Sequence, residues 1–143
     1  AGQFIPTFPY LGIEKPIQYI GTAAWNTPEF LDRLGPHAEG AILVDAFFPQ
    51  SRNPQIHTFT STFQKVFHTT PTSLEALAYD AASIVKEIVQ SGSYSRLDVY
   101  EALQKTHHFP GITGPITFQK DHFTRPLQIL TVRHGKIVEV ETP

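Results

Sequence analysis

The stretch PIQYIGTAAWNTPEFL (residues 16–31) predicts the order strand, loop and helix on which the fold depends. A short apolar run that ends at Gly21 is typical of a buried strand. Thr27 followed by Pro28 is typical of a helix start, because a threonine side chain caps free backbone amides and proline fits the first helical position. Trp25, the only tryptophan in the chain, lies in the loop between them.

The residues that follow this stretch predict the end of the helix and a second strand. The helix is expected to end at Gly35-Pro36, since glycine and proline favour helix termination. The apolar run from Ala41 to about Phe48 predicts a second strand, which Pro49 ends. These elements together predict a β-α-β unit.

Three helices are expected in the middle of the chain. Asn53 is placed to cap the first, and Ser95 the third. Thr72 and Glu75 have the spacing of a capping box, in which each side chain bonds a free amide near the other residue. On the second helix, Asp80 is interpreted as a solvated group and Glu75 as a capping group.

Two of these helices carry apolar stripes, which predict buried faces. On the first, the stripe comprises Ile56, Phe59, Phe63 and Phe67. On the second, it comprises Leu74, Leu77, Ala78, Ala81, Val85, Ile88 and Val89.

The end of the chain is β-like. PITF, LQILTV and KIVEV (residues 115–118, 127–132 and 136–140) predict short strands, and Arg133-His134-Gly135 predicts a tight hairpin turn. The whole order indicates an α/β fold with too few strands to close a doubly wound sheet.

The composition excludes several classes of protein. Of the 143 residues 41 % are hydrophobic and 17 % are charged, which is typical of a globular domain. The formal net charge of −2, with scattered Lys and Arg, argues against nucleic-acid binding. Cysteine is absent, so no disulfide or thiol nucleophile is expected. Methionine is absent as well, and the sequence is interpreted as a piece of a longer translation product.

No catalytic residue, metal site or cofactor is predicted. The seven histidines lack the spacing of a metal site, since no HExxH motif occurs and His107 and His108 are adjacent. No G-x-S-x-G elbow or glycine-rich phosphate loop occurs. An enzyme is therefore not expected.

The candidate binding residues follow the two predicted strands. Ligands of open α/β sheets bind beyond the carboxyl ends of strands, where loops diverge. The residues placed there are Thr22, Ala23, Trp25, Asn26, Asp45 and Phe48. The alternative is that Trp25 and the pair Phe47-Phe48 only close the core, as large aromatic side chains commonly do.

Several motifs in a fixed order resemble one known family. They are AEGA (38–41), AYDA (78–81) after Pro71, G..G.I.F (111–118) and a terminal hairpin with GKI (135–137). Together they resemble the C-terminal portion of type I periplasmic binding proteins, the superfamily of leucine/isoleucine/valine-binding and receptor-type proteins. The resemblance implies a partial fold of this type, a Rossmann-like lobe without most of the N-terminal lobe.

The resemblance also implies how the chain is divided. Residues 1–48 and 110–143 would belong to the C-terminal lobe, and residues 49–109 would be helices of the N-terminal lobe. Since the sheet that these helices cover in the family is missing, the chain is expected to associate with a companion piece, to form a segment-swapped homo-oligomer, or to fold the helices onto its own strands.

The resemblance implies an extracytoplasmic solute-binding protein that delivers a small polar molecule to an ABC permease. In amino-acid-binding members the loop after the first strand supplies an acid for the ligand ammonium, but Thr22-Ala23-Ala24 supplies none. The chain is also similar to penicillin-binding-protein activator lipoproteins, which imply contact with a peptidoglycan synthase instead. Either role implies a periplasmic or envelope location, with signal and anchor outside this sequence.

Overall fold

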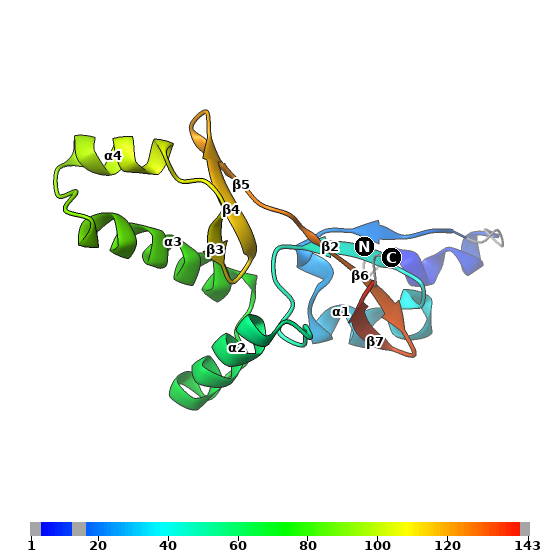
Figure 1. Cartoon of the computed structure of the whole chain (residues 1–143). Coiled ribbons are helices and arrows are strands. Elements are labelled where there is room, and N and C mark those ends of the chain that lie inside the picture. The colour runs from blue at the N-terminus through cyan, green and yellow to red at the C-terminus, as the bar shows by residue number, and fades with distance from the viewer. Residues whose placement is uncertain (1–3, 13–16, 141–143) are drawn as a thin grey trace. The chain divides into compact units, whose positions relative to one another are not determined.

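The structure is a computed structural model, and it describes residues 4–12 and 17–140 (Figure 1). The chain forms two compact units. Unit 1 comprises Ala1–Asp45 and Gln128–Pro143, and unit 2 comprises Ala46–Leu127. The assignment of residues 1–48, 49–109 and 110–143 to lobes of the family fold stays a prediction, while the compact units divide at 45/46 and 127/128.

Unit 1 is built on a four-stranded sheet in the order β1-β2-β6-β7. Its strands are β1 (Ile20–Gly21), β2 (Ile42–Asp45), β6 (Gln128–Arg133) and β7 (Lys136–Glu139). β1 is parallel to β2, whereas β6 is antiparallel to both β2 and β7. Leu43 lies opposite Leu130, and both are fully buried. The first two strands are shorter than expected, since β1 covers only the end of the apolar run and β2 ends at Asp45.

Helix α1 (Pro28–Leu34) begins and ends where the sequence predicts. The Thr27 hydroxyl accepts a hydrogen bond from the Phe30 amide at 3.2 Å. Gly35 ends the helix with a φ of 51°, a backbone conformation that residues with a side chain rarely adopt. Phe30 and Leu34 are buried and contribute to the core of unit 1. Short 3₁₀ turns complete the unit: η1 (Ile5–Thr7), η2 (Pro9–Leu11), η3 (Ala23–Trp25) and η4 (Gly35–Ala38).

The β6–β7 hairpin confirms the predicted turn. Arg133 pairs with Lys136, so that His134 and Gly135 form a two-residue loop, and both have positive φ. The Glu39 carboxylate accepts hydrogen bonds from the His134 amide at 2.9 Å and the Gly135 amide at 3.3 Å. These two backbone donors lower the pKa of Glu39. The hairpin is therefore tied to a residue 95 positions earlier in the chain.

This contact predicts a pH-dependent contribution to stability. Because the folded-state pKa of Glu39 is lowered, its contribution is present above the unfolded-state pKa and is lost as the pH falls through the folded-state value. Glu39→Gln is expected to lower the urea midpoint at about pH 7, and the difference from the parent chain shrinks towards about pH 3. Equal differences at both pH values would contradict this. Glu29→Gln, on an exposed part of α1, is the matched control.

Unit 2 contains three helices and a small sheet (Figure 1). The helices are α2 (Pro54–Phe67), α3 (Ser73–Gln90) and α4 (Arg96–Gln104). All three predicted caps are confirmed: Asn53 accepts from the Gln55 amide, and capping boxes join Thr72 to Glu75 and Ser95 to Asp98. In both capping boxes, hydrogen bonds from the capping residue lower the pKa of the acid.

The sheet of unit 2 is antiparallel, with the strand order β3-β4-β5. Its strands are β3 (Phe109–Gly111), β4 (Gly114–Gln119) and β5 (His122–Thr124). Ile116 of β4 packs with Ile84 and Ile88 of α3, while Val99 and Leu103 of α4 cover the same cluster. A second cluster joins Phe47, Ile56 and Ala76.

The predicted face of α3 is corrected by the structure. The buried positions are Ala76, Asp80, Ile84 and Ile88. Of the predicted stripe only Ile88 is buried, whereas Leu74 is 72 % exposed and Val85 is 47 % exposed. Apolar residues surround most of this helix, so periodicity alone does not identify the side that packs on β4. Within the described part of the chain, no helix is long and apolar enough to span a membrane.

Candidate functional site

The parallel pairing of β1 and β2 places two loops at one edge of the sheet in unit 1. Ile20 pairs with Ile42 and Gly21 with Leu43, so both strands end side by side. Thr22 and Ala23 follow β1 directly and are exposed to solvent. Asp45 is the last residue of β2. The structure therefore brings the 22–26 loop close to the end of β2.

A side-chain hydrogen bond joins these two places. The Asn26 Nδ2 atom donates to Asp45 Oδ2 at 2.8 Å. Asp45 is only 3 % exposed, and a buried carboxylate requires such donors because desolvation of its charge is costly. Asn26 is half-buried, so it lies between the buried acid and the exposed start of the loop. The buried Asp45 carboxylate thus holds the 22–26 loop through Asn26.

Trp25 packs against its own unit and is still partly exposed. Its ring stacks on Phe30 of α1, with a centroid distance of 4.6 Å and an interplanar angle of 21°. It also covers Gly21 so closely that a Cβ atom there would lie 2.2 Å from Trp25 Cδ2. The indole of Trp25 therefore requires glycine at position 21. The packing role of Trp25 is established, and its role in binding stays a prediction.

Phe48 belongs to unit 2, whereas the other five candidate residues belong to unit 1. It is 5 % exposed, and its neighbour Phe47 is fully buried in the cluster with Ile56 and Ala76. Phe47 also packs edge-on against Phe59 at a centroid distance of 5.8 Å. Both Phe47 and Phe48 are therefore buried, as the core interpretation expects, and a binding role of Phe48 stays a prediction. Five of the six candidates lie at the carboxyl ends of β1 and β2 in unit 1, namely Thr22, Ala23, Trp25, Asn26 and Asp45.

Asp80 has a role that the sequence interpretation missed. It is 1 % exposed rather than solvated, and its carboxylate accepts three hydrogen bonds from the turn between β3 and β4. The donors are the Ile112 amide at 2.6 Å, the Thr113 amide at 3.0 Å and the Thr113 hydroxyl at 2.6 Å. Arg125 Nη1 in turn donates to the Thr113 hydroxyl at 2.8 Å.

The close approach of this turn depends on Gly111. A Cβ atom at that position would lie 2.8 Å from Asp80 Oδ2 and 2.6 Å from Ile116 Cδ1. The AYDA and G..G.I.F motifs therefore belong to one structural device, the anchoring of a turn on α3. Asp80 lies four residues after Ala76 and four before Ile84, on the buried side of α3, but the sequence alone does not identify that side of the helix. Among residues 4–12 and 17–140, no group of three or more His, Asp or Glu side chains is arranged to hold a metal ion.

The comparisons with known proteins agree on one family. The family model for periplasmic binding proteins matches residues 1–136. A protein from Rhodospirillum rubrum, provisionally assigned as a branched-chain amino acid ABC transporter, is 27 % identical and has a TM-score of 0.86 over 97 % of this chain and 41 % of its own. No curated protein matches the sequence.

Two further solved structures share the fold. A leucine-binding protein from Thermotoga maritima is 22 % identical, with a TM-score of 0.76 over 98 % of this chain and 40 % of its own. A branched-chain amino acid transporter substrate-binding protein from Streptococcus pneumoniae, solved with isoleucine, is 24 % identical, with a TM-score of 0.73 over 98 % and 42 %. The present chain thus spans about two fifths of each. It has part of the type I periplasmic-binding-protein fold, and it belongs to the periplasmic binding protein family.

Proposed function

We propose that this chain is part of an extracytoplasmic solute-binding receptor for an ABC-type transporter. The observation that carries the proposal is the pairing of the 22–26 loop with the end of β2 through the Asn26–Asp45 hydrogen bond, in a chain of this family. Unit 1 would provide one wall of a ligand site that closes between two lobes, and the helices of unit 2 would belong to the other lobe. Its place would be the periplasm or cell envelope.

The exposed part of the loop favours a ligand contact that is not ionic. Thr22, Ala23 and Ala24 are exposed and uncharged, and the acid that is hydrogen-bonded to this loop, Asp45, is buried. An unpaired ammonium group placed against this loop would lose solvation without gaining a charged partner. We therefore expect this wall to contribute hydrogen bonds from Thr22 and Asn26 and an aromatic surface from Trp25, and any ligand charge to be neutralised elsewhere.

A thermal-shift screen tests the receptor role. The receptor is screened against amino acids, amides and small carboxylates. A ligand at 100 times its Kd is expected to stabilise the fold by about 2.7 kcal/mol, which corresponds to a rise in Tm of several degrees. No shift with any compound, combined with binding to a purified peptidoglycan synthase, would contradict this role and favour the activator-type alternative.

Replacing Trp25 tests the location of the site. Trp25→Ala is expected to weaken the ligand found in the screen by about tenfold or more, because it removes the aromatic wall. Trp25→Phe, which keeps a ring over Gly21, separates binding from packing, and Tyr10→Ala, at an 89 % exposed aromatic residue, is the matched control. Unchanged affinity in a folded Trp25→Ala variant would limit Trp25 to a packing role.

A further inference from the structure

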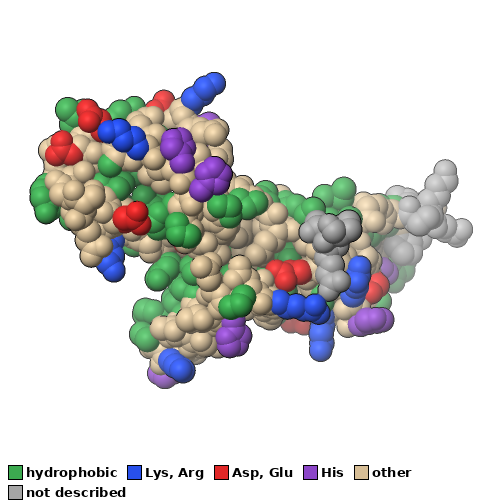
Figure 2. All heavy atoms as spheres, in the orientation of Figure 1, with side chains coloured by type: hydrophobic (Ala, Val, Ile, Leu, Met, Phe, Trp, Pro, Cys, Tyr) green, Lys and Arg blue, Asp and Glu red, His purple; other side chains and the backbone are tan. Residues whose placement is uncertain are grey.

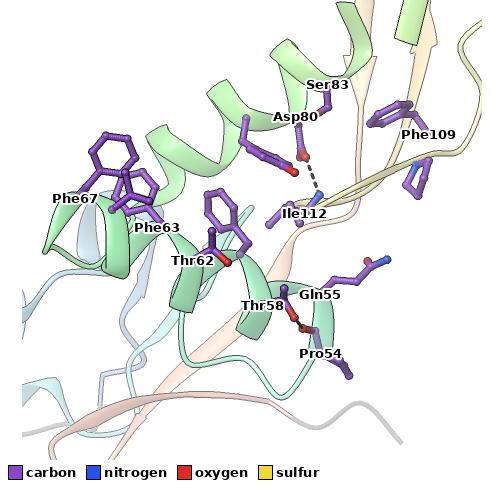
Figure 3. A pocket seen from close by; sticks show the side chains of 14 residues that line it. Pro54, Gln55, Thr58, Thr62, Phe63, Phe67, Asp80, Ser83, Phe109 and Ile112 are labelled. Carbon is purple, nitrogen blue, oxygen red and sulfur yellow. Dashed lines mark hydrogen bonds between the residues drawn. The ribbon is translucent and has the colours of Figure 1, made fainter. Parts of the chain in front are cut away.

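Unit 2 has a groove where the last turns of α3 and α4 meet the segment that leads into β3. Its volume is about 370 Å³. Figure 2 shows histidine side chains together at the surface there, in the orientation of Figure 1. Phe109 and Pro110 line this groove and also the more apolar groove along α2 that Figure 3 draws. All residues that line the new groove belong to unit 2, so it shares none with the 22–26 loop of unit 1.

The lining of this groove combines an apolar floor with a charged rim. Ile84 and Ile88 of α3 are buried, and Phe109 packs against their cluster. The exposed rim includes a cation, Lys105 at the end of α4, and an acid, Glu87 of α3. Such a lining suits a small molecule that has an apolar body and a charged end.

His107 and His108 both line the groove, although adjacent side chains of an extended chain point in opposite directions. The backbone is not extended here, because His108 has a φ of 53°. Few residues other than glycine adopt this conformation, although histidine does so more often than most, and such strained positions cluster at ligand sites. The two histidines, whose adjacency in the sequence argues against a shared site, therefore contribute to one groove.

Hydrogen bonds hold the segment that carries these side chains. The Thr106 carbonyl accepts from the Phe118 amide at 2.9 Å, and the His108 amide donates to the Thr117 hydroxyl at 3.0 Å. The Thr106 hydroxyl donates to the Ala102 carbonyl at 3.3 Å. The segment is therefore fixed to both α4 and β4 before a ligand binds, which reduces the entropic cost of binding.

The side chains of the rim indicate the class of ligand. Imidazole N–H groups and a lysine ammonium are donors that suit a carboxylate. Among the described residues, no group of three or more His, Asp or Glu side chains is arranged to hold a metal ion. We propose that this groove binds a small organic monocarboxylate, with the carboxylate at Lys105, His107 and His108 and the apolar body on the floor. Glu87 restricts the class, because it repels a second negative group. The site does not depend on the proposed receptor function.

Titration of the full chain with benzoate, and with benzamide as its uncharged counterpart, tests the class of ligand. The side-chain NMR signals of His107 and His108 are expected to shift saturably with benzoate. This readout is local, so binding of the same probe elsewhere on the chain does not imitate it. Benzamide is expected to bind at least about tenfold more weakly, because it offers Lys105 no charged partner. Lys105→Gln is expected to weaken benzoate by a similar factor, and Lys65→Gln, at an exposed lysine of α2, is the matched control.

A variant of His108 separates binding from structure. His108→Gly keeps the amide that bonds Thr117 and adopts the positive φ without strain, which offsets the added flexibility of the unfolded chain. Its urea midpoint is therefore expected to equal or exceed that of the parent chain, while its affinity for benzoate falls at least about tenfold. His57→Gln, at an exposed histidine of α2, is expected to change neither quantity.

Three results would overturn the proposal. The first is the absence of a saturable shift at His107 and His108, or equal shifts at all seven histidines, which would indicate unspecific anion binding. The second is equal affinity for benzoate and benzamide. The third is a folded His108→Gly variant that binds benzoate as tightly as the parent chain.

Discussion

Asp80→Ala is expected to lower the free energy of unfolding of unit 2 by about 3–5 kcal/mol, because the three donors that bond this buried carboxylate lose their acceptor. A hydrogen bond to a charged group contributes about 1.5–3 kcal/mol, and the three bonds share one carboxylate, so their effects do not add fully. The donors at Ile112 and Thr113 lie in a turn that water does not reach freely, since Thr113 is 3 % exposed. The turn is therefore expected to detach from α3.

Asp80→Asn keeps the shape of the side chain but removes one of its two hydrogen-bond acceptor oxygens. The amide retains one oxygen but presents an NH₂ group to a backbone or hydroxyl donor, so it is expected to cost less than alanine and still be clearly destabilising. Urea unfolding followed by the helical circular dichroism signal measures the effect, because α2, α3 and α4 all lie in unit 2. Glu87→Ala, at an exposed acid on the same helix, is the matched control. Equal losses in the Asp80 and Glu87 variants would show that the turn does not depend on the carboxylate.

Local signals in the sequence were sufficient wherever the deciding contacts are local. Thr27 and Thr72 bond amides two or three residues away, and the His134-Gly135 turn needs only its own backbone conformation. The resemblance of the ordered motifs to a family was confirmed for the same reason, since motif order is a property of the sequence itself.

Contacts distant in the sequence account for what could not be predicted. Asp80 meets donors 32 and 33 positions away, and nothing in AYDA alone indicates that the acid faces inward. α3 has apolar residues on most sides, so the side that is buried depends on where β4 docks. In the candidate site, the sequence predicts that Thr22 and Asp45 lie close together, because both follow or end a strand at its carboxyl end. The Asn26–Asp45 hydrogen bond and the burial of Asp45 depend on tertiary packing and could not be predicted.

The contact between Gly21 and Trp25 gives the second large effect. Gly21→Ala is expected to displace the indole, because the new methyl group would lie 2.2 Å from Trp25 Cδ2, far inside van der Waals contact. Overpacking of this kind costs about 1–3 kcal/mol. Trp25 is the only tryptophan, so its fluorescence reports this site alone. The emission maximum is expected to shift to longer wavelength as the ring leaves Phe30 and becomes solvated.

A double-mutant cycle shows whether the indole is the cause. In a Trp25→Ala background, Gly21→Ala is expected to cost much less, so that the coupling energy between the two positions is about 1 kcal/mol or more. Urea unfolding followed by circular dichroism measures all four proteins, since two of them lack the fluorophore. If Gly21→Ala is equally destabilising with and without Trp25, the loss arises from the strand backbone. If it is neutral in both, the indole does not rest on Gly21. The predicted coupling instead means that the position of Trp25, the partly exposed aromatic wall of the proposed site, is set by the absence of a side chain at Gly21.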